Sequence, residues 1–239
     1  MRTIFKRDFL AYFRTPTGYA FMGVFLSLAG FIFYLYNLST LSSDILSFFS
    51  QLTLLVMLLT PMLAMRLISE DRQKRTDQLL LTTPISLGKT VMGKFLAAAC
   101  VILITILLTN VYTLIIAIYG VVYPGEWFVG LLGFTLQSLC FLALDLFVSC
   151  FAKNPLTSAV FAFAANFVLW MTDLLANNIS ITWIQNVLNF ISLYDRYEPF
   201  ILGQLSYSSI LFFLSFIAVC LAGATHVLDS RRFSGGGAA

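Results

Sequence analysis

Long apolar runs separated by short polar stretches make up most of the chain. A helix needs about 20 mostly apolar residues to cross the roughly 30 Å of hydrocarbon in a bilayer. Runs of this length extend over residues 18–38, 45–67, 91–119, 126–151, 155–175 and 207–228, and their charged residues lie almost entirely at the edges. The pattern therefore predicts an all-α membrane protein with six transmembrane helices.

Two other segments are amphipathic rather than uniformly apolar. Residues 2–14 place aromatic residues such as Phe5 and Phe9 on one helical stripe, with Arg7 on the opposite side. This pattern is typical of a helix that lies in the membrane interface. The uncharged segment 183–194 has two open interpretations: an interfacial helix packed on the bundle, or a short re-entrant helix that shapes the outer end of a substrate route.

The composition agrees with a membrane-embedded chain. Of the 239 residues, 59% are hydrophobic and 10% are charged, whereas a soluble domain has roughly one quarter charged residues. We expect three parts: an N-terminal amphipathic helix (1–16), a six-helix transmembrane domain (17–230) and a flexible C-terminal tail (231–239) that ends in Gly and Ala. No cleaved signal peptide is expected, because the first apolar run is longer than the roughly 7–15 apolar residues of such a signal.

Positive charge lies mainly on one side of the predicted membrane. The net charge is +3, but the fourteen Lys and Arg residues alternate with apolar runs and form no single basic face, which argues against nucleic-acid binding. With the N-terminus in the cytoplasm, thirteen of the fourteen lie on the cytoplasmic side and only Arg196 lies outside. Because short cytoplasmic loops are enriched in Lys and Arg, we expect a multi-pass protein of a bacterial inner (cytoplasmic) membrane, surrounded by its lipids, with both termini cytoplasmic.

The longest polar connection, residues 66–94, carries the strongest functional signal. Thr76 suits a helix N-cap, Asp77 suits the first helical turn, and Pro84 would end the short helix that follows. Residues 79–81, all leucine, would form one apolar face of this helix. Such a face stays exposed unless a partner covers it. The connection therefore predicts a docking site for another protein.

Several residues of this connection and of the apolar run after it match a known family. They are Glu70, Thr76, Leu79, Leu80, Pro84, Ile85, Ser86, Gly93 and Lys94. With this pattern the sequence resembles the permease subunits of ABC-2 type ATP-binding-cassette transporters, and the gliding-motility-associated permeases look closest among them. Arg75 departs from the pattern, because the family usually has glycine at that position.

The resemblance implies a transport function and its partners. Residues 76–82 would be the coupling helix, which docks in a groove of a separate cytoplasmic ABC ATPase. The chain would pair with a second permease copy or a sister permease and would move its substrate by alternating access, with export favoured. The ATPase would hydrolyse ATP, so we expect no catalytic site, cofactor or metal in this chain. The residues expected to contact the ATPase are Glu70, Arg75, Thr76, Asp77, Gln78, Leu79, Leu80, Leu81, Thr82 and Pro84.

Three other signals are too weak to predict chemistry. Gly88, Lys89 and Thr90 look like the end of a phosphate-binding loop, but Thr83 occupies the position of the first glycine that such a loop requires. The single histidine, His226, has no identifiable partner for a metal site or a hydrolase. The four cysteines lie inside apolar runs without a C-x-x-C pair, so we expect them to be buried hydrophobic residues.

Asp145 is an acid inside the fourth apolar run, near its cytoplasmic end. An ionisable residue in a span is costly and often functional, so a position in a proton or cation path is one interpretation. Burial against polar groups of another helix, or a position near Lys153 at the interface, is the other. An ion-coupled secondary transporter is the alternative function, but it should show several such charges. An intramembrane enzyme would need a nucleophile and a base that the sequence does not reveal.

Overall fold

The computed structural model describes residues 1–69, 86–176 and 192–234, and the regular secondary structure in these ranges is helical throughout. The helices are α1 (Arg2–Arg14), α2 (Pro16–Phe33), the π-helix η1 (Tyr34–Leu38), α3 (Ile45–Ala64), α6 (Leu87–Tyr119), α7 (Pro124–Ser149), α8 (Pro155–Ala176), α10 (Leu193–Ile201) and α11 (Tyr207–Ser234). Within the described ranges, six stretches are long and apolar enough to cross a membrane: α2 with η1, α3, α6, α7, α8 and α11. The prediction of an all-α protein with six transmembrane helices is therefore confirmed.

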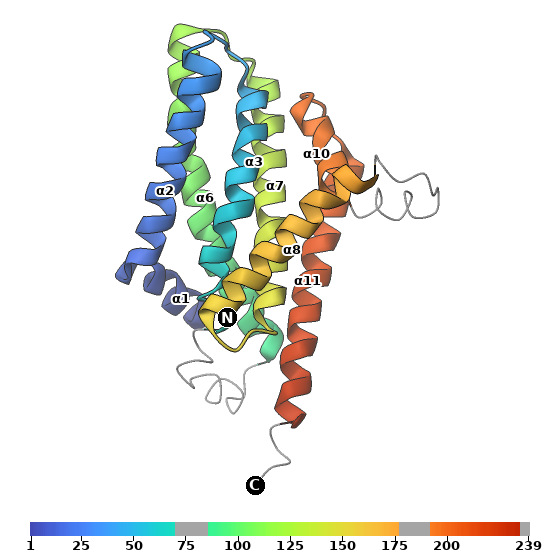
Figure 1. Ribbon diagram of the computed structural model, residues 1–239. Coiled ribbons are helices and arrows are strands. Elements are labelled where there is room, and N and C mark those ends of the chain that lie inside the picture. The colour runs from blue at the N-terminus through green and yellow to red at the C-terminus, as the bar shows by residue number, and fades with distance from the viewer. Residues whose placement is uncertain (70–85, 177–191, 235–239) are drawn as a thin grey trace.

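Helix α7 lies at the centre of the bundle (Figure 1). It packs against α3, α6, α8, α10 and α11. Helices α2 and α6 lie to one side of α3 and α7, α11 lies to the other side, and α8 crosses obliquely in front of them. The N-terminus, α1 and the end of α11 lie at the same end of the bundle, which we call the terminal end, and η1 lies at the opposite end.

Capping residues in the sequence determine where several helices begin. At the start of α3, the Asp44 carboxylate accepts hydrogen bonds from the backbone N–H groups of Leu46 and Ser47, both at 3.1 Å. Pro16 and Pro124 occupy the first turns of α2 and α7, where a missing N–H removes no helical hydrogen bond. These local signals place the helix boundaries near the edges of the predicted apolar runs.

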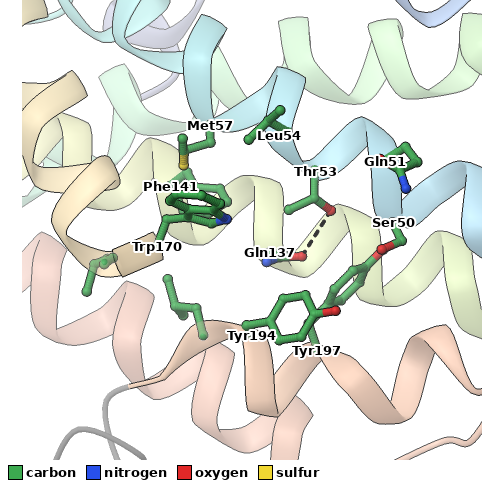
Figure 2. Close-up of a pocket in the computed structure, with 12 residues that line it drawn as sticks. Ser50, Gln51, Thr53, Leu54, Met57, Gln137, Phe141, Trp170, Tyr194 and Tyr197 are labelled. Atoms are coloured by element: carbon green, nitrogen blue, oxygen red, sulfur yellow. Dashed lines mark hydrogen bonds between the residues drawn. The ribbon is translucent and has the colours of Figure 1, made fainter. Parts of the chain in front are cut away.

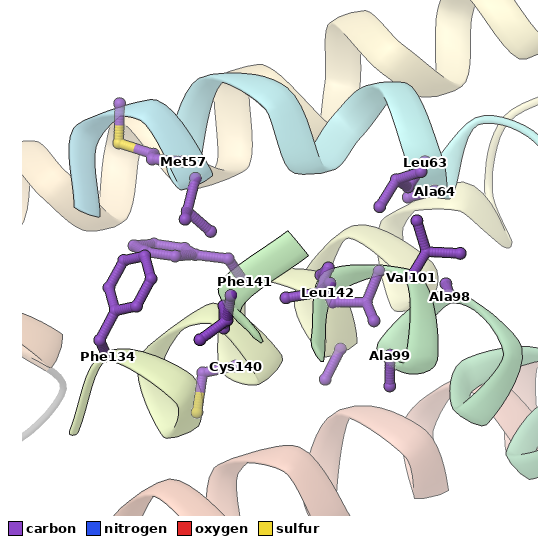
Figure 3. Close-up of a cluster of buried hydrophobic side chains, with 14 of the residues drawn as sticks. Met57, Leu63, Ala64, Ala98, Ala99, Val101, Phe134, Cys140, Phe141 and Leu142 are labelled. Carbon is purple, nitrogen blue, oxygen red and sulfur yellow. The ribbon is translucent and has the colours of Figure 1, made fainter. Parts of the chain in front are cut away.

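The core combines small and large apolar side chains (Figure 3). Ala64 of α3, Ala98 of α6 and Leu142 of α7 are fully buried in the same cluster. Small residues let helices approach closely in a membrane, where van der Waals packing drives helix association. Further along the bundle, the rings of Phe49 and Phe134 stack with their centroids 5.7 Å apart. The core therefore joins the central helices by close contact rather than by charge.

The cysteines belong to this packing. All four are free thiols, and Cys140, Cys150 and Cys220 are buried, which confirms the expectation for these three. Cys100 is half-buried.

Two glycines on α7 allow neighbouring helices to pack directly on its backbone. A Cβ atom at Gly130 would lie 2.7 Å from Cδ2 of Leu46 on α3. A Cβ atom at Gly133 would lie 2.5 Å from both Cβ and Cγ of Phe200 on α10. Both separations are shorter than real side chains show, so α10 can lie against α7 because residue 133 has no side chain.

Replacing Gly133 with alanine is expected to destabilise the bundle, because the added methyl group overlaps the fully buried Phe200 side chain. Overpacking of a well-packed core typically costs about 1–3 kcal/mol. Thermal unfolding in detergent micelles should show a lower midpoint for this variant. Gly23→Ala is the matched control, because no atom lies within 4 Å of its Cβ position and alanine favours a helix. Equal midpoints for the two variants would contradict this packing.

Candidate functional site

The predicted coupling segment lies outside the residues that the structure describes. This holds for every residue expected to contact an ATPase: Glu70, Arg75, Thr76, Asp77, Gln78, Leu79, Leu80, Leu81, Thr82 and Pro84. It also holds for residues 183–191 of the second amphipathic segment and for residues 235–239 of the predicted tail. The structure does describe both sides of the connection: α3 ends and α6 begins at the terminal end of the bundle (Figure 1).

A helix is present where the pattern of residues 2–14 predicted one. The rings of Phe5 and Phe9 stack on it with their centroids 5.8 Å apart, as their shared stripe predicted. Ile4 and Tyr12 are buried against the bundle. Helix α1 packs against α2 and α6, so contacts with the transmembrane helices hold it in place.

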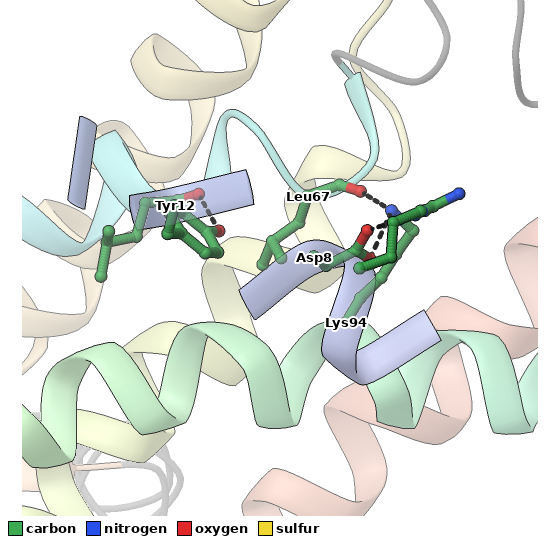
Figure 4. Close-up of polar contacts among 6 residues, drawn as sticks. Asp8, Tyr12, Leu67 and Lys94 are labelled. Atoms are coloured by element: carbon green, nitrogen blue, oxygen red, sulfur yellow. Dashed lines mark hydrogen bonds and ion pairs between the residues drawn. The ribbon is translucent and has the colours of Figure 1, made fainter. Parts of the chain in front are cut away.

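Polar contacts tie α1 to both sides of the connection between α3 and α6 (Figure 4). The Tyr12 hydroxyl donates a hydrogen bond to the Leu63 carbonyl oxygen at 2.9 Å. The Lys94 ammonium group donates to the Leu67 carbonyl oxygen and lies 3.3 Å from Asp8 Oδ2. Lys94 is 4% exposed, so its charge is buried together with that of its partner. We call these residues, Asp8, Tyr12, Leu63, Leu67 and Lys94, the α1 anchor.

Gly93 allows α1 to approach α6 this closely. A Cβ atom at Gly93 would lie 3.3 Å from Cγ2 of Ile4 and 3.4 Å from the Met1 carbonyl oxygen, which is tighter than most real contacts. Gly93 and Lys94 therefore both position α1 against α6. The first makes room for α1 on the surface of α6, and the second binds α1 through a buried ion pair.

A proline in α3 creates a polar contact with α8 inside the bundle. Pro61 has no N–H, so the Met57 carbonyl oxygen, four residues earlier, lacks its helical donor. The Asn166 side chain on α8 supplies one: its Nδ2 atom lies 3.2 Å from the Met57 carbonyl oxygen and 3.4 Å from Thr60 Oγ1. Asn166 and Thr60 are fully buried. Helix α8 is therefore hydrogen-bonded to α3 at the backbone group that the proline leaves unpaired.

Asp145 lies beside this contact, inside the bundle. Its side chain is fully buried, and the polar side chains of Thr60 and Asn166 are its neighbours. Within the described residues, however, neither carboxyl oxygen makes a hydrogen bond of acceptable geometry. Lys153, which lies beyond the end of α7, is exposed. Of the two positions considered from the sequence, the structure shows burial against polar groups of other helices.

A cavity of about 290 Å³ opens between α3, α7, α8 and α10 (Figure 2). Thr53 donates a hydrogen bond to Gln137 Oε1 at 3.3 Å in its wall. Burial raises the pKa of the Tyr197 hydroxyl, which therefore keeps its proton. The cavity thus offers aromatic rings and uncharged hydrogen-bonding groups. These side chains are Ser50, Gln51, Thr53, Gln137, Phe141, Trp170, Tyr194 and Tyr197.

Six membrane-crossing helices with polar groups buried between them define a multi-pass membrane protein. Comparison with known families then identifies its family: the model of the ABC-2 family transporter protein matches residues 3–234, nearly the whole chain. The chain therefore belongs to the ABC-2 transporter family and is a permease component of an ABC transporter. Membership implies association with an ABC ATPase and often with a second permease. No individually curated protein matches the sequence.

Family membership confirms the resemblance that the sequence showed. The finer placement among the gliding-motility-associated permeases stays a prediction.

Proposed function

We propose that this permease exports its substrate by alternating access, and that residues 76–82 form the coupling helix that receives the movement of a separate ATPase. In a chain of this family, the α1 anchor is the observation that carries the proposal. It fixes the two helices that flank the predicted coupling segment to a third helix at the terminal end of the bundle. A coupling segment can transmit a movement to the bundle only if the helix ends on both sides of it are fixed.

The distribution of charge supports a cytoplasmic position for the coupling segment. Helix α3 ends and α6 begins at the terminal end, where α1 and the end of α11 also lie. With this end inside, thirteen of the fourteen Lys and Arg residues are cytoplasmic. The enrichment of Lys and Arg in short cytoplasmic loops therefore favours this orientation, in which the segment faces the compartment that contains ATP.

The described contacts offer a route from the coupling segment to the cavity. Two contacts hold α1, α3 and α6 together at the terminal end of the bundle: the ion pair of Lys94 with Asp8 and the hydrogen bond from Tyr12 to Leu63. The three helices would therefore move together at this end. Helix α3 extends from the terminal end to the cavity, where it contributes Thr53 to the wall. A push on the coupling segment would therefore move the cavity wall as part of a rigid-body change between two arrangements of the bundle.

The proposal assigns ATP hydrolysis to the partner subunit. A phosphate-binding loop follows a buried strand and precedes a helix, whereas Gly88, Lys89 and Thr90 lie in the first turn of α6. The family supplies this activity from a separate ATPase. A second permease copy or a sister permease would complete the membrane part, with the transport route between the two halves.

Purification of the chain from its native membrane tests this function. We expect an ATPase subunit to accompany the chain and the complex to hydrolyse ATP, while the chain alone does not. An ion-coupled secondary transporter would instead function in liposomes without an ATPase, under an ion gradient. Purification without an ATPase, or ATP hydrolysis by the chain alone, would contradict the proposal.

A further inference from the structure

Helix α1 carries an aromatic row along its length, because residues four positions apart lie above one another on a helix. Phe5, Phe9 and Phe13 are half-buried, and the centroids of neighbouring rings are 5.8 Å and 5.0 Å apart. The row continues onto α2, where the exposed ring of Tyr19 lies 5.6 Å from that of Phe13. Tyr19 belongs to the first turn of the first membrane-crossing stretch. The aromatic row therefore lies at the level where the bundle enters the membrane.

A row of exposed cations borders the aromatic row on the side away from the bundle. The side of α1 that faces the bundle contains the buried Ile4 and Tyr12. Each residue advances by about 100° around a helix, so the aromatic row comes next, and the cations follow it. They are Arg2, Lys6 and Arg14, all exposed, and we call them the cationic row.

The protein does not neutralise the cationic row within the described residues. Asp8 is the one acid of α1, and it lies 2.7 Å from Arg7 and 3.3 Å from Lys94. None of the three cations of the row forms an ion pair in the part of the chain that the structure describes. A cation beside aromatic rings at the membrane surface lies at the level of the lipid headgroups. The charge of the row is thus available to an anionic partner at this level.

We infer that α1 is a binding surface for acidic phospholipids. The aromatic row would lie at the edge of the hydrocarbon, and the cationic row would contact the headgroups. A zwitterionic headgroup compensates its phosphate with its own cation, whereas an acidic headgroup keeps a net negative charge. Each Lys or Arg near an acidic membrane surface strengthens binding by about fivefold. The inference goes beyond the coupling segment, because its partner is a lipid and not the ATPase.

The continuity of the aromatic row with α2 favours a lipid over an acidic protein as the occupant. Tyr19 is 59% exposed on a membrane-crossing helix, so the row extends onto a surface that lipid covers. The opposite side of α1 carries the contacts of the α1 anchor. A lipid bound to the outer side would therefore hold α1 against the bundle, and hydrogen exchange in residues 2–14 should become slower.

Lipid binding by the whole chain tests this inference. Native mass spectrometry of the chain in detergent micelles, titrated with phosphatidylglycerol or phosphatidylcholine, gives a dissociation constant for each lipid. The wild type should bind the acidic phosphatidylglycerol more tightly. The double variant Lys6→Gln, Arg14→Gln should bind it about 25-fold more weakly, because two contributions of about fivefold are lost. Binding of phosphatidylcholine should not change.

A variant with a displaced cation separates position from net charge. The double variant Lys6→Gln, Ala11→Lys keeps the charge of α1 but moves one cation to an exposed position opposite the aromatic row. It should bind phosphatidylglycerol about fivefold more weakly than the wild type, as Lys6→Gln alone does. Lys6→Arg keeps the cation in place and should retain the wild-type constant. Hydrogen exchange in residues 2–14, measured in phosphatidylcholine nanodiscs, shows whether α1 remains folded in each variant.

Three results would overturn the inference. The first is equal affinity of the wild type for the two lipids, and the second is wild-type affinity for phosphatidylglycerol in Lys6→Gln, Arg14→Gln. The third is wild-type affinity in the variant with the displaced cation, which would show that net charge alone attracts the lipid. Loss of the ATPase from Lys6→Gln, Arg14→Gln, with lipid binding unchanged, would assign the cationic row to a protein partner instead.

Discussion

Replacing Leu79 and Leu80 together with aspartate is expected to abolish binding of the ATPase subunit. In our proposal these leucines fill the centre of the contact, where the few residues that dominate binding lie and each contributes about 2 kcal/mol or more. Aspartate would also place unpaired charges in an apolar groove, which is costly. A combined loss of roughly 4 kcal/mol corresponds to about 1000-fold weaker binding. Co-purification of the ATPase and ATP hydrolysis by the complex measure this effect.

Leu41→Asp is the matched control for the double variant. Leu41 follows η1 at the other end of the bundle, is 89% exposed and has a φ of 52°. Aspartate adopts such a positive φ more readily than leucine does, so this exchange should leave folding and ATPase binding unchanged. Normal ATPase binding by the Leu79→Asp, Leu80→Asp variant would refute the proposed contact. Equal loss in the Leu41 control would show that added acidic charge, rather than position, is responsible.

Replacing Lys94 with methionine is expected to loosen α1 from the bundle. Methionine keeps most of the side-chain volume but removes the partner of Asp8 and the donor to the Leu67 carbonyl oxygen. Removing one partner of a buried ion pair costs about 3–5 kcal/mol. Because the Asp8 side chain keeps 13% exposure and also contacts Arg7 at 2.7 Å, we expect the lower end, about 3 kcal/mol. Hydrogen exchange in residues 2–14 should become faster, and the thermal midpoint should fall.

Two further variants separate the ion pair from a general loss of charge. Arg7→Ala removes an exposed partner of Asp8, and exposed pairs contribute about 0–1 kcal/mol, so exchange in α1 should change little. The double variant Asp8→Asn, Lys94→Met leaves no unpaired carboxylate and should be more stable than Lys94→Met alone. Unchanged exchange in Lys94→Met would contradict the α1 anchor.

The architecture could be predicted because membrane solvation imposes a simple rule on the sequence. A helix that crosses hydrocarbon must be apolar over about 20 residues, so each span is visible in a local window. The observed spans, such as Ile45–Ala64 and Pro124–Ser149, begin at residues that also carry local signals, including the Asp44 cap and Pro124. The N-terminal helix could also be predicted from a short window of sequence, because its aromatic stripe depends on residues three and four positions apart.

The polar contacts could not be predicted because they join residues far apart in the chain. Asn166 and Met57 are 109 residues apart, and Tyr12 and Leu63 are 51 apart. Local signals for some of them existed: Asp8 is an acid in a basic segment, and Pro61 leaves an unpaired carbonyl oxygen in a span. Neither signal identifies the residue that completes the contact. The cavity was missed for the same reason, although amides such as Gln137 inside apolar runs hinted at it.

The buried contact between α3 and α8 lies next to the cavity and suggests how the membrane part could work. Asn166 and Trp170 are one turn apart on α8, the first bonded to the Met57 carbonyl oxygen of α3 and the second in the cavity wall. Met57 accepts from Asn166 and also lines the cavity. Movement of α8 would therefore change this contact and the cavity wall in the same step.

The central claim is that residues 76–82 are held by an ATPase in the cytoplasm, and site-specific cross-linking tests it most directly. A photo-reactive amino acid would replace Gln78, which comes just before the three leucines, in cells that contain the native partner subunits. The account predicts a cross-linked product that contains this chain and an ATPase subunit. Two results together would contradict it: residue 78 forms no cross-linked product with an ATPase, and a membrane-impermeant reagent labels residue 78 from outside the cell.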